Sequence, residues 1–214
     1  IFTRVRDEYP SAVTCYAGCS DCCHALFDLP LIEAVYLNRA FNAAFPHGPA
    51  RSAILERADA ADRAVHKIKR KAFKAEQAGE NTNDILEQLS REKIRCPLLV
   101  EEEGNPESRR CALYAQRPLT CRLYGIPTAI GGKGHTCALS AFDPGKQYPT
   151  VKMEALYGRL ATLSVELARC AGSGYSQIHT VLVPVSMALL TDYNAAYFGI
   201  GIQTAHSERI KNNG

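Results

Sequence analysis

Apolar side chains recur every three or four residues in three stretches of the chain, which is the spacing of one face of a helix. The stretches cover residues 30–45, 54–78 and 153–171, and a proline or a glycine follows each of them. Proline and glycine end helices, and polar residues fill the opposite faces. The pattern therefore predicts three amphipathic helices, the middle one being the longest.

Two shorter helices are also expected. Thr82 or Asn83 can cap a short helix that runs through Leu89, because a side-chain oxygen at that position accepts a backbone N–H. A last helix is expected from Pro184 to Gly199. The final dozen residues are predicted to form a polar tail.

Three segments lack helical periodicity. Residues 1–23 are predicted to form a loop or a single helical turn, and residues 96–100 a weak strand, since a proline follows Cys96 directly. Residues 101–149 are rich in proline and glycine and are predicted to be loops that need something to organise them. The predicted helices and these irregular segments together indicate a mainly α fold. We expect a single compact helical domain whose loop-rich cysteine region is organised by metal.

The organisation of the chain follows from its length and patterning. At 214 residues, it suits one domain over residues 1–214, with a cysteine region at 15–137 and a C-terminal helical part at 148–200. Apolar residues make up 46% and charged residues 22%, as in ordinary globular proteins.

The charge and hydropathy patterns narrow the choice of partners. The net charge of +3 is spread among acidic neighbours, which argues against a nucleic-acid partner. No run reaches the roughly 18 apolar residues of a membrane span, so no membrane contact is expected. The partner is expected to be another protein or a protein substrate, neither of which the pattern identifies.

Nine cysteines are the most unusual feature of the composition. Their number is odd, and a disulfide-stapled secreted domain is usually shorter and pairs its cysteines evenly. Thiols kept reduced for metal in the cytosol explain the cysteines better, so we expect a cytoplasmic protein. Cys170 stands apart at the end of a predicted helix and is assigned to packing.

The other eight cysteines form two groups. The first is Cys15-x3-Cys19-x2-Cys22-Cys23, whose spacing places side chains on one side of a helical turn. The second lies in the irregular region and consists of Cys96, Cys111, Cys121 and Cys137. All eight are predicted metal ligands. They can serve two four-cysteine sites, one site with spare thiols, or one larger cluster, and spacing does not choose between these arrangements.

The spacing favours iron–sulfur chemistry over zinc. Structural zinc sites are usually built from paired Cys-x2–4-Cys knuckles, and the second group contains none. Iron–sulfur clusters accept looser thiolate spacing, so a cluster is the preferred cofactor and zinc the alternative. His24 and His135 stand beside cysteines and are more consistent with hydrogen-bond partners of the ligands than with ligands.

Positive and aromatic residues flank the second cysteine group. Arg117 and Arg122 can offset the negative charge of several thiolates. With Tyr114 and Tyr124 they are predicted to surround the cofactor.

The motifs resemble a known family. Cys15-x3-Cys19-x2-Cys22-Cys23, the later Cys96-Pro97, the stretch Cys111-x2-Tyr114-x2-Arg117-Pro118-x2-Cys121-Arg122 and then Cys137 are together similar to the YkgJ-type cysteine-cluster family, a zinc- or iron-chelating domain of the CxxCxxCC type. The family has eight cysteines, and all eight positions are filled here. It also includes flagellin lysine N-methylases, so the resemblance implies S-adenosylmethionine-dependent methylation of protein lysine as a possible activity.

Four functions therefore compete. The first is a cysteine-cluster protein with an iron–sulfur cluster and a redox or enzyme-supporting role. The second is the lysine methyltransferase, although Gly131-Gly132-Lys133-Gly134 is more typical of a turn than of a nucleotide-binding loop. The third is a radical S-adenosylmethionine enzyme, which the lack of alternating strands and helices disfavours. The fourth is a zinc-held structural interaction module.

Overall fold

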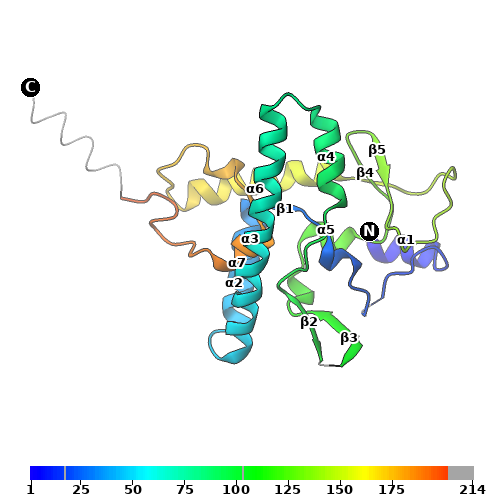
Figure 1. Cartoon of the computed structure of the whole chain (residues 1–214), viewed down its shortest axis with the longest axis horizontal. Coiled ribbons are helices and arrows are strands. Elements are labelled where there is room, and N and C mark those ends of the chain that lie inside the picture. Colours follow the sequence, from blue (N-terminus) through cyan, green and yellow to red (C-terminus); the bar gives the residue numbers. More distant parts are fainter. Residues whose placement is uncertain (17, 103, 202–214) are drawn as a thin grey trace, which may run out of the picture.

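The computed structural model describes residues 1–16, 18–102 and 104–201, and helices dominate it, as predicted (Figure 1). Its main helices are α2 (Leu31–Ala44), α3 (Pro49–Gln77) and α6 (Met153–Cys170). They match the three stretches of helical periodicity. No helix among the described residues is long and apolar enough to span a bilayer.

The largest hydrophobic cluster lies where α2 and α3 meet the short helix α7 (Val185–Leu190). Phe41 of α2, Ile54 of α3 and Ala188 of α7 are almost completely buried in it. Large apolar side chains held at this depth each stabilise the fold by about 1.5–3 kcal/mol. This cluster forms the rigid support on which one side of the cysteine region rests.

Helices α3 and α4 (Thr82–Arg91) form a hairpin that protrudes from the body of the molecule (Figure 1). Gly79 makes the turn with a φ of 84°, and the side chain of Asn81 accepts a hydrogen bond from the Asn83 N–H at 2.8 Å. The predicted short helix is therefore present. Its capping residue is Asn81 rather than Thr82 or Asn83.

The N-terminal segment is more ordered than its sequence suggested. Residues Phe2–Glu8 form helix α1, where the sequence predicted a loop, and Val5 is buried there with Leu123 and Met153 in a second hydrophobic cluster. Burial against distant residues stabilises a helix that is too short to form alone. The predicted helical turn is present further on, as the 3-10 turn η1 (Asp21–His24).

The strands are short and lie in three small sheets. β1 and β7 pair antiparallel, β2 and β3 form a hairpin, and β4 lies between antiparallel β5 and parallel β6. Their bounds are Asp28–Pro30 for β1, Leu99–Glu102 for β2, Asn105–Cys111 for β3, Thr128–Ile130 for β4, Lys133–His135 for β5, Val151–Lys152 for β6 and Leu182–Pro184 for β7. The predicted strand near residues 96–100 is thus confirmed in part, as β2.

Residues 101–149 are less irregular than predicted. Besides β2 to β5 they contain the 3-10 turn η2 (Tyr114–Gln116) and helix α5 (Leu119–Leu123). Gly131 and Gly132 both have positive φ and make the tight turn between β4 and β5. The prediction of a turn at these glycines is confirmed.

The last predicted helix begins where expected but ends early. Helix α7 stops at Leu190, well before Gly199. The buried side chain of Asn38 donates hydrogen bonds to the carbonyl oxygens of Ala188 and Thr191 at 2.9 and 3.0 Å, and Thr191 is extended. A partner from α2 thus occupies the carbonyls that a longer helix would use. The predicted polar tail lies outside the described residues.

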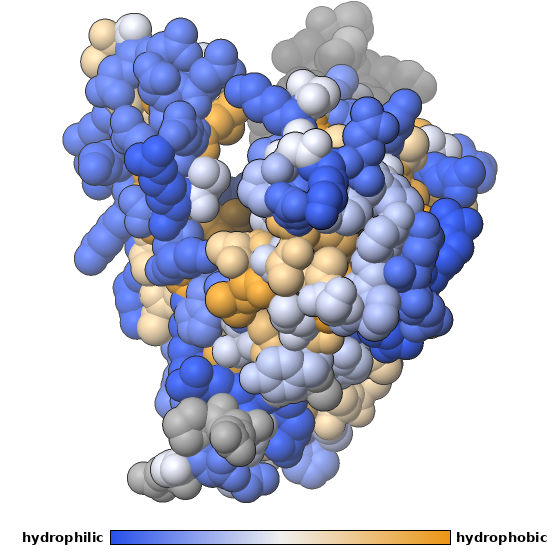
Figure 2. Space-filling view, turned by 90° about the vertical axis from the view of Figure 1, so that its right-hand side faces the viewer, coloured by the Kyte–Doolittle hydropathy of each residue, from blue (hydrophilic) through white to orange (hydrophobic). Residues whose placement is uncertain are grey.

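Polar and apolar surfaces are unevenly distributed on the face that carries the N-terminal part of the chain. In Figure 2, hydrophobic residues gather around a hollow in the middle of this face, and hydrophilic residues surround them.

Candidate metal centre

The first cysteine group is held in tight backbone turns. The Cys19 N–H donates to the Tyr16 carbonyl at 3.0 Å, and the Cys23 N–H donates to the Ser20 carbonyl at 2.9 Å. The η1 turn then places Cys22 and Cys23 on consecutive positions of a 3-10 helix. These local bonds keep the thiols of one short segment together.

The second group reaches the first through a backbone ladder. The Cys96 N–H donates to the Cys23 carbonyl at 2.7 Å, and the Ile94 N–H donates to the His24 carbonyl at 3.0 Å. Next along the chain, Leu99 of β2 stands opposite Cys111 of β3 in the hairpin, and the Leu99 N–H donates to the Cys96 carbonyl at 3.0 Å. Cys23, Cys96 and Cys111 are therefore neighbours despite their distance in sequence.

Cys121 is delivered by helix α5. Its first N–H, from Leu119, donates to Glu33 Oε1 of α2 at 2.6 Å. A carboxylate at a helix N-terminus satisfies a backbone donor that has no partner within the helix. Cys121 is then hydrogen-bonded to Cys22, so α2 fixes where the two cysteine groups meet.

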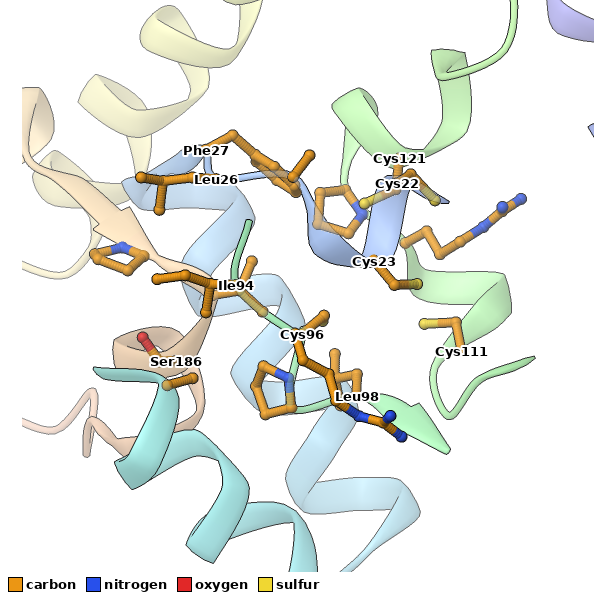
Figure 3. A pocket seen from close by; sticks show the side chains of 18 of the residues that line it. Cys22, Cys23, Leu26, Phe27, Ile94, Cys96, Leu98, Cys111, Cys121 and Ser186 are labelled. Carbon is orange, nitrogen blue, oxygen red and sulfur yellow. The ribbon is translucent and has the colours of Figure 1, made fainter. Parts of the chain in front are cut away.

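Figure 3 shows how these side chains are arranged. Cys22 and Cys121 lie together, with Cys23 and Cys111 next to them and Cys96 between Ile94 and Leu98. Cys96 and Cys111 also pack against the large hydrophobic cluster of α2, α3 and α7.

Cys15 and Cys137 complete the group from the other side. Cys15 packs against the N-terminal hydrophobic cluster, next to Gly125. A Cβ at Gly125 would lie 2.9 Å from the Cys15 Cβ, so only glycine allows this approach. The Thr14 hydroxyl donates to the Leu139 carbonyl at 2.6 Å, which holds the loop of Cys137 beside Cys15.

Cys22 is the cysteine whose thiolate form is most strongly favoured by its neighbours. Hydrogen bonds from Cys121 and then from Cys23 lower the pKa of the Cys22 thiol to about 3, and the positive charge of Arg117 adds to this effect. The pKa values of the donors Cys121 and Cys23 rise, because each keeps the proton that it donates, and partial burial adds to the rise. One thiolate therefore forms readily, while its neighbours hold protons.

Four further thiols favour the neutral form in the absence of a metal. Burial raises the pKa of Cys96 to about 12 and also raises the pKa values of Cys111, Cys15 and Cys137. Proximity of the other thiols adds to the rise at Cys96 and Cys15. Metal binding would have to displace these protons, which makes it dependent on pH.

The interactions connect all eight predicted ligands. A negative charge on Cys22 raises the pKa values of thiols in both groups, and a charge on Cys19 raises those of Cys15 and Cys137. Cys170 is exposed, so the packing role predicted for it is wrong.

Arg117 lies close enough to the thiols for its charge to act on them. Its charge favours the thiolate forms of Cys15, Cys22 and Cys111. Its guanidinium lies 3.5 Å from the ring centre of Tyr114, and its Nε donates to the Tyr114 carbonyl at 3.0 Å. Tyr114 thus acts on the site by holding Arg117.

Arg122 and Tyr124 occupy different positions from Arg117. Arg122 Nε donates to the Arg117 carbonyl at 2.7 Å, and its guanidinium also binds the Ala115 carbonyl, so it shapes the loop. The Tyr124 hydroxyl donates to Asp21 Oδ2 at 3.0 Å, and the Cys137 thiol points at the same oxygen at 3.7 Å. Burial raises the pKa of the Tyr124 hydroxyl, and the negative charge of Asp21 raises it further.

The two histidines beside the cysteine groups have different surroundings. His24 Nδ1 donates to the Ser20 carbonyl at 3.1 Å and so supports the turn that carries Cys22 and Cys23. His135 is exposed on β5.

Three residues of the site were not found by sequence reasoning: Asp21, Glu33 and Gly125. Asp21 stands inside the first cysteine motif, and this position was the one feature of the sequence that could have marked it as part of the site. Glu33 and Gly125 act across long sequence distances, on Leu119 and Cys15. No local pattern marks such contacts.

The donor set fits a thiophilic metal centre. Eight thiols, one readily formed thiolate and a facing guanidinium supply soft ligands and positive charge. Among the described residues, no group of three or more His, Cys, Asp or Glu stands in a geometry that could hold a metal ion directly. The thiols would therefore have to turn out of their mutual hydrogen bonds to bind one.

The fold and the thiol set define a metal-chelating cysteine-cluster domain. The chain belongs to the CxxCxxCC family, described as "Putative zinc- or iron-chelating domain", whose model matches residues 14–138, more than half of the 214 residues. The resemblance predicted from the motifs is confirmed. No curated protein and no solved structure gives a significant match to the chain.

Proposed function

We propose that the chain holds an iron–sulfur cluster through Cys15, Cys19, Cys22, Cys23, Cys96, Cys111, Cys121 and Cys137, and serves a redox or enzyme-supporting role toward another protein. The observation that carries this proposal is that the thiols of both groups converge on Cys22, which is hydrogen-bonded to Cys23 and Cys121.

The chemistry of the donors supports iron over zinc. Structural zinc sites often include histidine among their ligands. Here all the candidate ligands are thiols, and the nearby His24 binds a backbone carbonyl. Iron–sulfur clusters are held by thiolates, and their reduction potentials respond to charge and hydrogen bonds near the sulfurs. The charge of Arg117, which acts on Cys22, would supply such an effect.

A zinc-held structural module is the second candidate, and one observation favours it. Cys96 and Cys111 pack on the cluster of α2, α3 and α7, while Cys15 packs on the N-terminal cluster. A metal bound between them would join two hydrophobic clusters and contribute directly to folding.

Methyl transfer rests on the family resemblance alone. Gly131 and Gly132 form a hairpin turn, and the described sheets have two or three strands, unlike the barrel of radical S-adenosylmethionine enzymes. The geometry of the site adds no support for either of these activities.

Serine variants test the ligand proposal. Cys121→Ser, in protein purified without air, is expected to lose most of its metal and to melt at a lower temperature. Cys170→Ser is the matched control, because Cys170 is exposed and lies outside the residues 14–138 that match the family. It is expected to keep both properties. Full metal content and unchanged melting in Cys121→Ser would refute the assignment of Cys121 as a ligand.

A further inference from the structure

The protruding hairpin of α3 and α4 carries a concentration of positive charge (Figure 1). Residues 63–75 of α3 include six Lys or Arg side chains and no acidic one. Arg63 is ion-paired with Asp59. Lys69 is ion-paired with Asp28 of β1. The other four cations are exposed and have no side-chain partner among the residues that the structure describes: Lys67, Arg70, Lys71 and Lys74.

These four residues, called the basic face below, lie on one side of α3. Positions that are three, four and seven residues apart share a side of an α-helix, and the four residues have this spacing. Like charges at such positions repel one another and destabilise the helix. The helix dipole favours a cation only in the last turn, so it accounts for Lys74 but not for Lys67 or Arg70. A binding role would explain why the repulsion is kept.

An open apolar pocket adjoins the basic face. It lies between α3 and α4 and has a volume of about 300 Å³. Lys71 and Lys74 of the basic face line it together with apolar residues of both helices: Ile68, Ala72, Ala75, Ile85 and Leu89. A partner can therefore place an apolar side chain in the pocket while its acidic groups pair with the basic face.

The neighbouring helix carries the opposite charge. Glu80 and Glu92, at the two ends of α4, line the same pocket, and Asp84 is exposed in the first turn of the helix. A uniform polyanion, such as a nucleic acid or an anionic membrane, would be repelled by these carboxylates. A protein surface can place acidic groups against α3 and other groups against α4. The pattern of charge therefore favours a protein.

We propose that the α3–α4 hairpin is the docking site of a partner protein, which lays an acidic segment on the basic face and an apolar side chain in the adjoining pocket. Complementary charge of this kind speeds association and selects between partners. No cysteine lines the pocket. The inference therefore goes beyond the proposed function and applies whether the cysteine centre holds iron or zinc.

Fluorescence anisotropy with labelled peptides tests the proposal on the full chain. The first peptide is an amphipathic sequence of glutamate and leucine. The second has glutamine in place of each glutamate, and the third has serine in place of each leucine. The first is expected to bind about tenfold more tightly than the second and several-fold more tightly than the third. Its binding should weaken as salt is added, because salt screens exposed charges.

A fourfold variant of the basic face tests where the peptide binds. Glutamine at Lys67, Arg70, Lys71 and Lys74 is expected to weaken binding of the acidic peptide about tenfold. The helix should still form, since the substitutions remove repulsion. The control replaces four exposed cations on other elements by glutamine and so changes the net charge equally: Arg4, Arg39, Lys133 and Arg159. It is expected to bind the acidic peptide within about twofold of the wild type.

Equal binding of the glutamate and glutamine peptides, or an equal loss in the two fourfold variants, would overturn the proposal. Tighter binding of labelled oligouridine, or of phosphatidylserine vesicles, than of the acidic peptide would overturn the assignment of a protein partner. The metal content of each sample is measured in parallel and is expected to be the same in all three proteins. A failure of the docking site is thereby distinguished from a failure of the metal proposal.

Discussion

The guanidinium of Arg117 lies over the ring of Tyr114 at 3.5 Å while its charge acts on Cys22. The stacking and the hydrogen bond to the Tyr114 carbonyl hold the arginine toward the thiols. A fixed positive charge beside several thiolates lowers the electrostatic cost of assembling them, and it favours the reduced form of a redox centre.

Arg117→Gln is therefore expected to shift the midpoint potential of the centre to a more negative value, because adding an electron becomes harder without the nearby charge. Arg117→Lys should restore part of the shift. Spectroelectrochemical titration measures both variants. Arg110→Gln, at an exposed residue of β3, is the control. A potential that is the same in all four proteins would contradict the role of Arg117.

Gly125 is expected to be intolerant of a side chain. Its φ of 100° is unfavourable for alanine, and a Cβ would overlap the Cys15 Cβ at 2.9 Å. Gly145 has a similar φ of 98° with no atom within 4 Å, so Gly145→Ala isolates the backbone strain. We expect Gly145→Ala to cost about 1–2 kcal/mol of unfolding free energy, and Gly125→Ala to cost roughly 1–3 kcal/mol more. Urea unfolding measures both; equal losses would mean that the contact with Cys15 is unimportant.

The carboxyl of Glu33 is expected to make the stability of the protein depend on pH. Burial raises the pKa of its carboxyl, although the Leu119 N–H and the charge of Arg122 oppose the rise. A raised folded-state pKa means that the protonated form is favoured by folding, and this contribution is lost as the pH rises through the folded pKa. Glu33→Gln stays neutral and keeps an oxygen that can accept from Leu119.

The stability of Glu33→Gln relative to the wild type is therefore expected to increase from pH 4 to pH 7. Glu33→Ala also stays neutral but loses the acceptor, so it should be about 1–3 kcal/mol less stable than Glu33→Gln at both pH values, because a backbone donor is left without its partner. Urea unfolding at several pH values measures these differences. A Glu33→Gln difference that is independent of pH would contradict the burial of a charged carboxyl.

Much of the helical fold could be predicted from local pattern. The periodicity of residues 54–78 marks α3, because one apolar face is visible within a single segment. Helix α1 could not be predicted in this way, since it depends on the burial of Val5 against Leu123 and Met153. The early end of α7 depends on Asn38, which lies on another helix.

The same division applies to the site. The type and spacing of the cysteines indicated the ligand pool, and the position of Arg117 beside Pro118 indicated a role at the site. The contacts of Glu33 with Leu119 and of Gly125 with Cys15 exist only after distant segments meet. A cavity beside the thiols is likewise lined by α2, α3, β3 and α7 together with the segments that precede β1 and β2, and no single segment encodes it.

The most direct test of the central claim is a count of iron, acid-labile sulfide and zinc per chain in wild-type protein purified without air, with an ultraviolet–visible spectrum of the same sample. The account predicts iron with a matching amount of sulfide and a broad absorption band near about 400 nm. One or two zinc ions per chain, with no sulfide and no colour, would contradict the iron–sulfur proposal and leave the zinc-held module in its place.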